Sequence, residues 1–131
     1  KAAEQDIHNE TDKTLLLIED DPANHKYIRE LLEPEGYNLI ICETGSDGYE
    51  AFKNNPGIDL ILMDIKLPDT DGLEVTRKIR ASSANTELPI IAQTAYATKD
   101  DVKKSMDAGC NDHISKPFDS EELLEKIGKW L

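Results

Sequence analysis

The stretch that decides the fold is Ile58-Asp59-Leu60-Ile61-Leu62-Met63-Asp64. It contains five large aliphatic or sulfur-containing side chains and ends on a carboxylate. An apolar run of this length is typical of a central strand in a parallel sheet that helices cover on both faces. Asp64 would then lie at the carboxyl end of the strand, where open α/β sheets bind their ligands. An Asp after a strand also commonly begins a turn, so the rest of the chain must distinguish the two interpretations.

Strand-like and helix-like segments alternate along the rest of the chain. The other buried-strand patterns are Thr14–Ile18, Asn38–Cys42, Pro89–Gln93 and Asn111–Ser115. Apolar residues at helical spacing follow each strand, within residues 22–33, 46–53, 71–79, 98–106 and 119–130. Asp21, Asp71 and Asp119 are the expected N-caps of three of these helices. The alternation predicts an α/β fold: a doubly wound, flavodoxin-like, five-stranded parallel sheet in the order 2-1-3-4-5 with five helices.

Composition limits the class of protein. The 131 residues are 38% hydrophobic and 32% charged, which is typical of one soluble domain. We expect residues 1–13 to be a disordered tail or linker and residues 14–131 to be the folded domain. The net charge of −12 argues against a nucleic-acid partner. Because no apolar run approaches the roughly 20 residues that cross a bilayer, we expect no membrane contact and a cytoplasmic location. Cys42 and Cys110 are expected to be buried thiols.

Three acidic residues should meet at one edge of the sheet. Glu19 and Asp20 follow the first strand, and Asp64 ends the third, its neighbour in the predicted order. Two such charges about 4 Å apart repel by about 4 kcal/mol at an effective dielectric constant near 20. A bound cation or a raised pKa would relieve this repulsion. Oxygen ligands of this kind suit Mg²⁺.

The ends of the last two strands add a hydroxyl and an amine. Thr94 ends the fourth strand, and Lys116 follows the fifth. A lysine, a hydroxyl and a Mg²⁺ ion around one carboxylate can stabilise a transferring phosphoryl group. Asp64 is then the candidate nucleophile, and its product would be an acyl phosphate.

With these residues in place, the sequence from Thr14 to Leu131 resembles the receiver domains of bacterial two-component response regulators. The matching motifs are Leu17-Ile18-Glu19-Asp20-Asp21, Leu62-Met63-Asp64-Ile65-Lys66-Leu67-Pro68, Gly72, Pro89-Ile90-Ile91, Thr94-Ala95, Ala108-Gly109 and Lys116-Pro117.

The resemblance implies a complete set of roles. Asp64 would accept a phosphoryl group from a phosphohistidine on a histidine kinase or a histidine phosphotransfer domain. Asp20 and Asp64 would hold Mg²⁺, with Glu19 acting through water and the main-chain carbonyl of Lys66 as a further ligand. Thr94 would move toward the phosphoryl group, and Lys116 would pair with it.

Further implications concern the domain as a whole. A cis peptide bond would precede Pro117. The domain would catalyse its own phosphorylation and dephosphorylation without being an enzyme in its own right. Phosphorylation would change a surface made of the fourth helix, the fifth strand and the fifth helix, through which a homodimer could also form.

One position departs from the family pattern. The aromatic switch residue three positions before the lysine is His113 here, where the family usually has Tyr or Phe. Imidazole is smaller, more polar and titratable near neutrality, which puts the usual rotation of this side chain in doubt. Tyr96, two residues after Thr94, is an alternative gate over the pocket. His25 has no motif around it and is expected to face solvent.

Other functions remain in competition. A degenerate receiver that serves only for docking is the main alternative. An Asp-nucleophile phosphohydrolase of the haloacid dehalogenase type is disfavoured, because Lys66 stands where those enzymes place a second Asp. A flavin carrier is disfavoured because Glu19-Asp20-Asp21 would repel a phosphate. The first residue is Lys rather than Met, and with the polar leader and Asn24 this slightly favours a receiver cut from a hybrid sensor kinase over a stand-alone regulator.

Overall fold

The structure is a computed structural model that describes residues 12–82, 87–95 and 98–131. Asp12 and Lys13 are exposed and have no regular secondary structure. Residues 1–11 and Tyr96 lie outside the described ranges, so the expected tail stays a prediction. None of the described helices combines the length and apolar character needed to cross a membrane.

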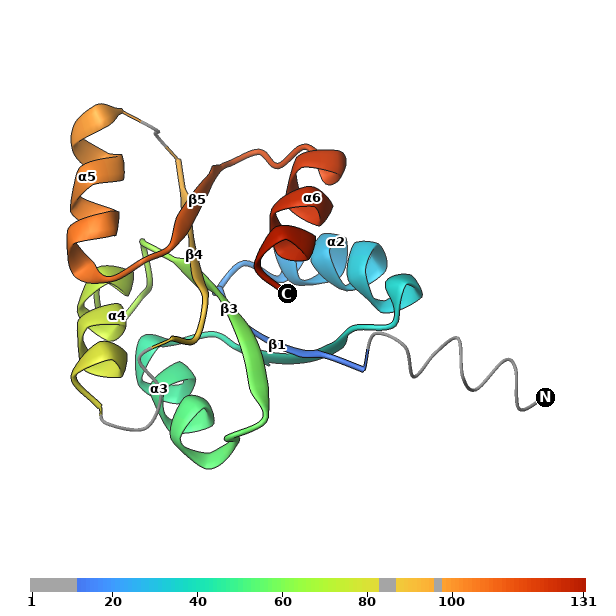
Figure 1. Cartoon of the computed structure of the whole chain (residues 1–131), viewed down its shortest axis with the longest axis horizontal. Coiled ribbons are helices and arrows are strands. Elements are labelled where there is room, and N and C mark those ends of the chain that lie inside the picture. Colours follow the sequence, from blue (N-terminus) through green and yellow to red (C-terminus); the bar gives the residue numbers. More distant parts are fainter. Residues whose placement is uncertain (1–11, 83–86, 96–97) are drawn as a thin grey trace.

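Five parallel strands form one sheet in the order β2-β1-β3-β4-β5 (Figure 1). The strands are β1 (Thr14–Ile18), β2 (Asn38–Cys42), β3 (Ile58–Asp64), β4 (Ile90–Thr94) and β5 (Asp112–Ser115). The predicted fold class and strand order are confirmed. Strands β4 and β5 each begin one residue later than the sequence suggested, and β4 ends on Thr94.

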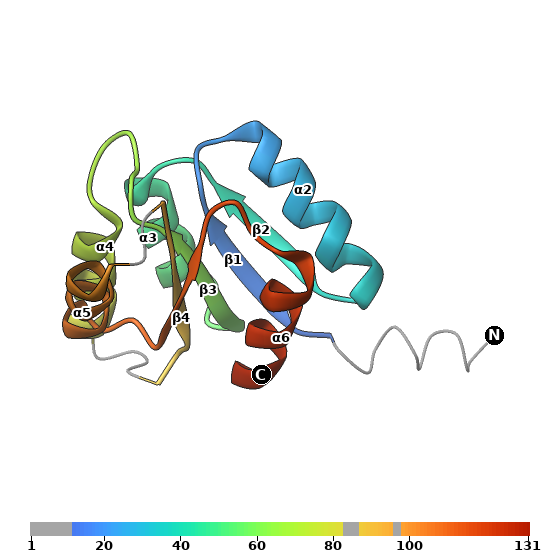
Figure 2. The ribbon, with the colours of Figure 1, turned by 90° about the horizontal axis from the view of Figure 1, so that it is seen from above.

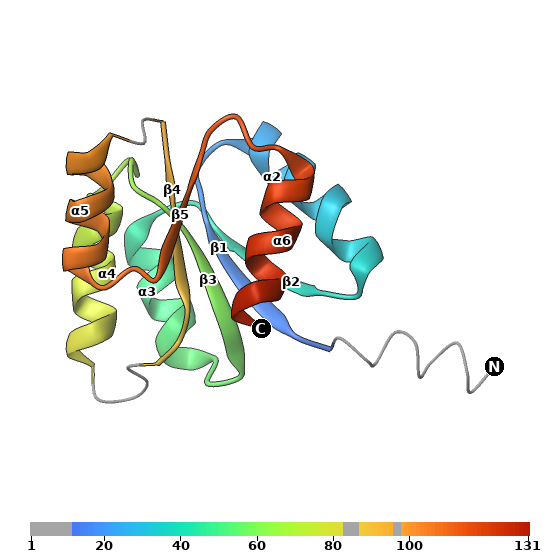
Figure 3. The same ribbon diagram turned by 45° about the horizontal axis from the view of Figure 1, so that its top comes forward.

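The helices cover both faces of the sheet. They are α2 (Pro22–Leu32), α3 (Gly45–Asn54), α4 (Gly72–Ala81), α5 (Lys99–Ala108) and α6 (Ser120–Trp130), with a short 3₁₀ turn η1 (Glu33–Glu35) after α2. Helices α2 and α6 lie on one face, and α3, α4 and α5 lie on the other (Figures 2 and 3). The crossovers place every carboxyl end of the strands at the same edge of the sheet.

Alternating side chains along each strand divide the core into two clusters. Ile61 and Met63 of β3 pack with α3 and α4, whereas Leu60 and Leu62 pack with α2 and α6. All four of these side chains are fully buried. Because β3 is apolar on both faces and is paired on both edges, Asp64 at its end is held in a rigid position.

Local capping explains where most helices begin. The carboxylate of Asp21 accepts a hydrogen bond from Ala23 N at 3.0 Å. That of Asp71 accepts one from Leu73 N at 2.8 Å. Both predicted N-caps are therefore confirmed. Asp119 occupies the predicted N-cap position of α6, but its side chain makes no capping hydrogen bond, so only the expected capping bond is wrong.

The two cysteines are free thiols, but they differ in burial. Cys110 is buried, as expected, while Cys42 on the outer strand β2 is only half-buried. The expectation of two buried thiols is wrong for Cys42. An edge strand has no neighbour on its outer side, so its side chains are covered less completely than those of a central strand.

Candidate functional site

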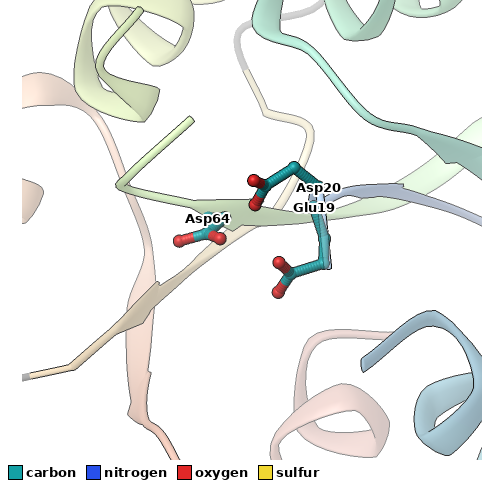
Figure 4. A group of neighbouring side chains, drawn as sticks. All are labelled: Glu19, Asp20 and Asp64. Carbon is teal, nitrogen blue, oxygen red and sulfur yellow. The ribbon is translucent and has the colours of Figure 1, made fainter. Parts of the chain in front are cut away.

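Three carboxylates converge at the carboxyl edge of the sheet. Glu19 and Asp20 follow β1, Asp64 ends β3, and oxygens of all three lie within 4.8 Å of one another (Figure 4). Glu19 and Asp64 are buried and Asp20 is exposed. The cluster exists because β1 and β3 are neighbours in the sheet, with Ile18 opposite Met63.

Lys116 supplies the positive charge that faces these acids. Its Nζ donates to Glu19 Oε1 at 2.8 Å and to Asp64 Oδ2 at 3.0 Å. The Lys116 side chain is 24% exposed, whereas the two carboxylates are almost completely buried. The Lys116–Pro117 peptide bond is cis, as the resemblance implied.

Burial and mutual repulsion perturb the acids unequally. Burial raises the pKa of Asp64 to about 6; the Glu19 charge adds to the increase, and the hydrogen bond from Lys116 opposes it. Burial also acts on Glu19, but hydrogen bonds from Lys116 and from Asp21 N outweigh it and lower the pKa of Glu19. For Lys116, burial is outweighed by the two carboxylates, which raise its pKa. The pair of acids therefore shares one ammonium, and Asp64 is the acid that is easier to protonate.

The remaining contacts of Glu19 fix its orientation. Its Oε1 also accepts from Asn24 Nδ2 at 3.2 Å, and its Oε2 accepts from Asp21 N at 3.1 Å. His25 Nε2 contacts the main-chain carbonyl of Glu19, and its side chain is half-buried. The expectation that His25 faces solvent is therefore wrong: α2 begins immediately after the acids and brings residue 25 back over them.

The loop after β3 is held at two points, Asp69 and Gly72, of which sequence reasoning missed the first. Asp69 accepts hydrogen bonds from Gly45 N at 2.8 Å and Ser46 N at 3.0 Å, at the start of α3. These bonds lower the pKa of Asp69. Gly72 approaches β3 so closely that a Cβ there would lie 2.0 Å from the carbonyl oxygen of Asp64. The family motif includes Gly72, but no local pattern indicated Asp69, because its partners lie 24 and 23 residues away.

The expected switch residues are only partly brought to the site. Thr94 is half-buried at the end of β4, and its carbonyl accepts a hydrogen bond from Lys116 N at 2.8 Å. His113 is half-buried on β5 opposite Ala92, two strands away from Asp64. The expected gate Tyr96 lies outside the described residues, so its role remains a prediction.

These groups line an open cleft of about 840 Å³. Its walls come from residues at or just after the ends of β1, β3, β4 and β5 and from helix α5. The residues expected to bind metal and phosphate all border it: Glu19, Asp20, Asp64, Lys66, Thr94 and Lys116. Gln93 of β4 also borders the cleft, and no sequence motif indicated it.

Comparison with known proteins identifies this architecture. The family model of the response regulator receiver domain matches residues 15–128. The chain therefore belongs to the response regulator receiver domain family, and it is a receiver domain of two-component signalling.

Individual relatives agree with this assignment. The polar-differentiation response regulator DivK of Brucella ovis is 38% identical over 120 residues, covering 91% of this chain and 96% of DivK. The receiver domain of sensor histidine kinase PA1611 from Pseudomonas aeruginosa PAO1 is 36% identical with a TM-score of 0.83, covering 91% of this chain and 97% of that one. That structure has a magnesium ion coordinated in its active site cleft.

A further solved structure includes a partner. A chain of the complex between the Saccharomyces cerevisiae histidine phosphotransfer signalling protein Ypd1 and the receiver domain of its downstream response regulator Ssk1 is 26% identical, with a TM-score of 0.83. The match covers 91% of this chain and 88% of that one. Receiver domains thus interact with histidine phosphotransfer proteins and bind Mg²⁺ at their acidic site, and the cluster of three carboxylates is the candidate acidic site here.

Proposed function

We propose that Asp64 is the phosphoacceptor and that its donor is a phosphohistidine on a histidine kinase or a histidine phosphotransfer domain. The observation that carries this proposal is the contact of one ammonium, that of Lys116, with both Asp64 and Glu19 at the edge of the sheet. An acid at the end of a rigid strand, beside a second acid and a cation, is suited to hold and neutralise a phosphoryl group.

The acidic cluster fits a Mg²⁺ ion. Asp20 is exposed, and its carboxylate lies next to those of Asp64 and Glu19 (Figure 4). Both oxygens of Glu19 already accept hydrogen bonds, which favours contact with the cation through water. The main-chain carbonyl of Lys66 would be a further ligand. The ion would neutralise negative charge on the phosphoryl oxygens.

Asp64, Lys116 and Thr94 would each have a separate role in the phosphoryl transfer. An oxygen of Asp64 attacks the phosphorus atom of a protonated phosphohistidine. The P–O bond to Asp64 forms, the P–N bond breaks, and its electron pair returns to the imidazole, which leaves as a neutral ring. Lys116 and Thr94 donate hydrogen bonds to the phosphoryl oxygens. Hydrolysis restores the free carboxylate of Asp64 when water attacks the same phosphorus atom and inorganic phosphate leaves.

Phosphorylation would then shift the population between two conformers. Movement of Thr94 toward the phosphoryl group would displace the loop between β4 and α5. The surface formed by α5, β5 and α6, which includes His113 on β5, would change its preference for partners or for a second copy of the chain. These three elements are the fourth helix, fifth strand and fifth helix of the sequence-based prediction.

Phosphotransfer from a radiolabelled histidine phosphotransfer domain tests the proposal. Asp64→Asn should remain folded and take up no label. Asp59→Asn is the matched control, because Asp59 lies at the other end of β3, where its carboxylate accepts a hydrogen bond from Thr14 N. The Asp59→Asn variant should take up label like the wild type.

Two further assays address the role of Lys116 and the docking-only alternative. Lys116→Ala should still accept phosphate but should respond weakly in a partner-binding assay, and a normal response would contradict the role of Lys116. Absence of any Mg²⁺-dependent response of the wild type to beryllofluoride, a phosphoryl mimic, would favour the docking-only alternative.

A further inference from the structure

Gln93 is a buried polar residue to which the phosphoacceptor chemistry gives no role. It lies in β4 within the sequence Ile90-Ile91-Ala92-Gln93-Thr94, and it is 0% exposed. Neither its Nε2 nor its Oε1 has a hydrogen-bond partner among the described residues. Burying an unpaired amide costs free energy. Gln93 therefore destabilises the resting fold relative to an apolar side chain of similar size at this position.

The sheet register places this amide inside the proposed phosphorylation site. Gln93 is the direct partner of Asp64 in the β3–β4 pairing. Side chains alternate along a strand, and Ile91 packs toward α2 and α6, so Gln93 points to that face as well. The same alternation puts Glu19, Asp64 and Lys116 on it, because Leu17, Leu62 and Ile114 belong to the same cluster. Glu19, Asp64 and Gln93 therefore lie in one row across β1, β3 and β4, and Lys116 lies on the same face two residues beyond Ile114, the β5 partner of Gln93.

Lys116 must extend across β4, the strand that carries Gln93, to reach its partners. It follows β5, while the oxygens that it contacts belong to residues at the ends of β1 and β3. Strand β4 lies between β3 and β5. The Lys116 ammonium thus reaches back across the end of β4 to Asp64, whose partner in β4 is Gln93.

Phosphorylation would change the acceptors around Lys116, because phosphoryl oxygens would replace the free carboxylate of Asp64. The oxygen Oδ2 of Asp64, which accepts from Nζ at 3.0 Å, belongs to the carboxylate that becomes an acyl phosphate. An ammonium has three N–H donors, and two of them are used by Glu19 and Asp64 in the described structure. The amide oxygen of Gln93, on the strand between β3 and β5, accepts no hydrogen bond from any described residue.

We propose that Gln93 is a positioning residue, whose Oε1 accepts a hydrogen bond from Lys116 Nζ in the phosphorylated state and holds the ammonium beside the phosphoryl group. This inference rests on the proposed function of Asp64 as the phosphoacceptor. The Gln93 amide would be unpaired in the resting state and hydrogen-bonded in the phosphorylated state. Gln93 would therefore stabilise the phosphorylated state relative to the resting state.

Two variants test the inference. Gln93→Met keeps an unbranched chain of similar length and removes both polar atoms. Ile91→Met is the matched control, because Ile91 is a fully buried residue on the same face of the same strand. The urea midpoint is measured without divalent cations, and the dissociation constant of beryllofluoride is measured in excess Mg²⁺ by ¹⁹F NMR.

The expected result separates the two states of the protein. Gln93→Met should have a urea midpoint equal to or above that of the wild type, yet bind beryllofluoride about tenfold more weakly or worse. Ile91→Met should bind beryllofluoride like the wild type. A purely structural role of Gln93 would not give higher resting stability together with lower affinity. Equal affinity in Gln93→Met, or loss of its fold, would overturn the inference.

A structure of the wild type with Mg²⁺ and beryllofluoride provides a measurement that needs no variant. Gln93 Oε1 should lie within about 3.2 Å of Lys116 Nζ. An amide that remains unpaired, or that bonds only to an ordered water, would refute the proposal. If the wild type itself fails to bind beryllofluoride, the proposed function of Asp64 fails; if it binds and Gln93→Met binds equally well, only the role of Gln93 fails.

Discussion

Neutralising Asp64 should stabilise the resting domain, and the gain should grow with pH. Asp64 is almost completely buried, next to Glu19, and shares Lys116 with it. Its pKa is raised from an ordinary value of 3.8 to about 6, primarily by burial. Asp64→Asn replaces the carboxylate by a neutral group of the same shape, and so removes the group whose ionisation the fold opposes.

The sign follows from proton binding. Between about pH 4 and pH 6 the folded state holds the Asp64 proton and the unfolded state has lost it, so the free energy of unfolding of the wild type falls as pH rises. At about 1.36 kcal/mol per pKa unit, a rise from 3.8 to about 6 corresponds to about 3 kcal/mol. The stability advantage of Asp64→Asn should therefore be near zero below about pH 4 and reach up to about 3 kcal/mol above about pH 7.

Urea unfolding at several pH values between 4 and 8 measures this difference. The single tryptophan, Trp130, reports the transition, and a chelator removes divalent cations. Subtracting the wild-type curve from that of Asp64→Asn isolates Asp64 from the other titrating groups. Added Mg²⁺ should raise the stability of the wild type by mass action and have much less effect on Asp64→Asn.

Asp112→Asn provides a control of opposite sign. Burial acts on Asp112 too, but hydrogen bonds from Trp130 Nε1, His113 N and Lys126 outweigh it and lower the pKa of Asp112. Asp112→Asn should therefore be less stable than the wild type at neutral pH, with the loss shrinking as the pH falls through the folded-state pKa. The reasoning is refuted if Asp64→Asn is less stable than the wild type at pH 8, or if its advantage does not grow with pH.

Two further predictions concern the loop after β3. Gly72→Ala should lower the free energy of unfolding by about 1–3 kcal/mol or more, because its Cβ would lie 2.0 Å from the Asp64 carbonyl oxygen. Urea unfolding measures this loss. Gly128→Ala in α6 is the control: its Cβ would have nothing within 4 Å, so this variant should gain about 0.5–1 kcal/mol. Asp69→Ala should cost about 0.5–2 kcal/mol, as the loss of an N-cap does, by removing its bonds to Gly45 N and Ser46 N. Hydrogen exchange should be faster at these two amides in Asp69→Ala, and unchanged exchange there would contradict the capping role.

Much of the fold could be predicted because its determinants are local. Apolar runs such as Leu60-Ile61-Leu62-Met63 define strands, and Asp21-Pro22 and Asp71 define where helices begin. Asp119 shows the limit of this reasoning: the sequence has capping-box spacing, but the structure makes no capping bond there.

The functional site could be predicted to the level of strand ends. Parallel strands bring Glu19, Asp20 and Asp64 to one edge whatever the side chains do. The hydrogen-bond partners of these side chains could not be predicted from the sequence. The unexpected contact of His25 with the Glu19 carbonyl depends on how α2 packs next to the end of β1. The hydrogen bond from Gly45 N to Asp69 depends on how the loop after β3 packs against the start of α3.

The sequence by itself thus determined the strands, the helices, the strand order expected for their alternation, and the acids, hydroxyl and lysine at the sheet edge. Only the tertiary structure decided that Lys116 contacts Glu19 and Asp64, 97 and 52 residues away in the sequence, and that Gln93 is buried without a hydrogen-bond partner among the described residues. The physical reason is range: periodicity and capping act within a few residues, whereas these contacts depend on the packing of four strands side by side and on the reach of one long side chain across them.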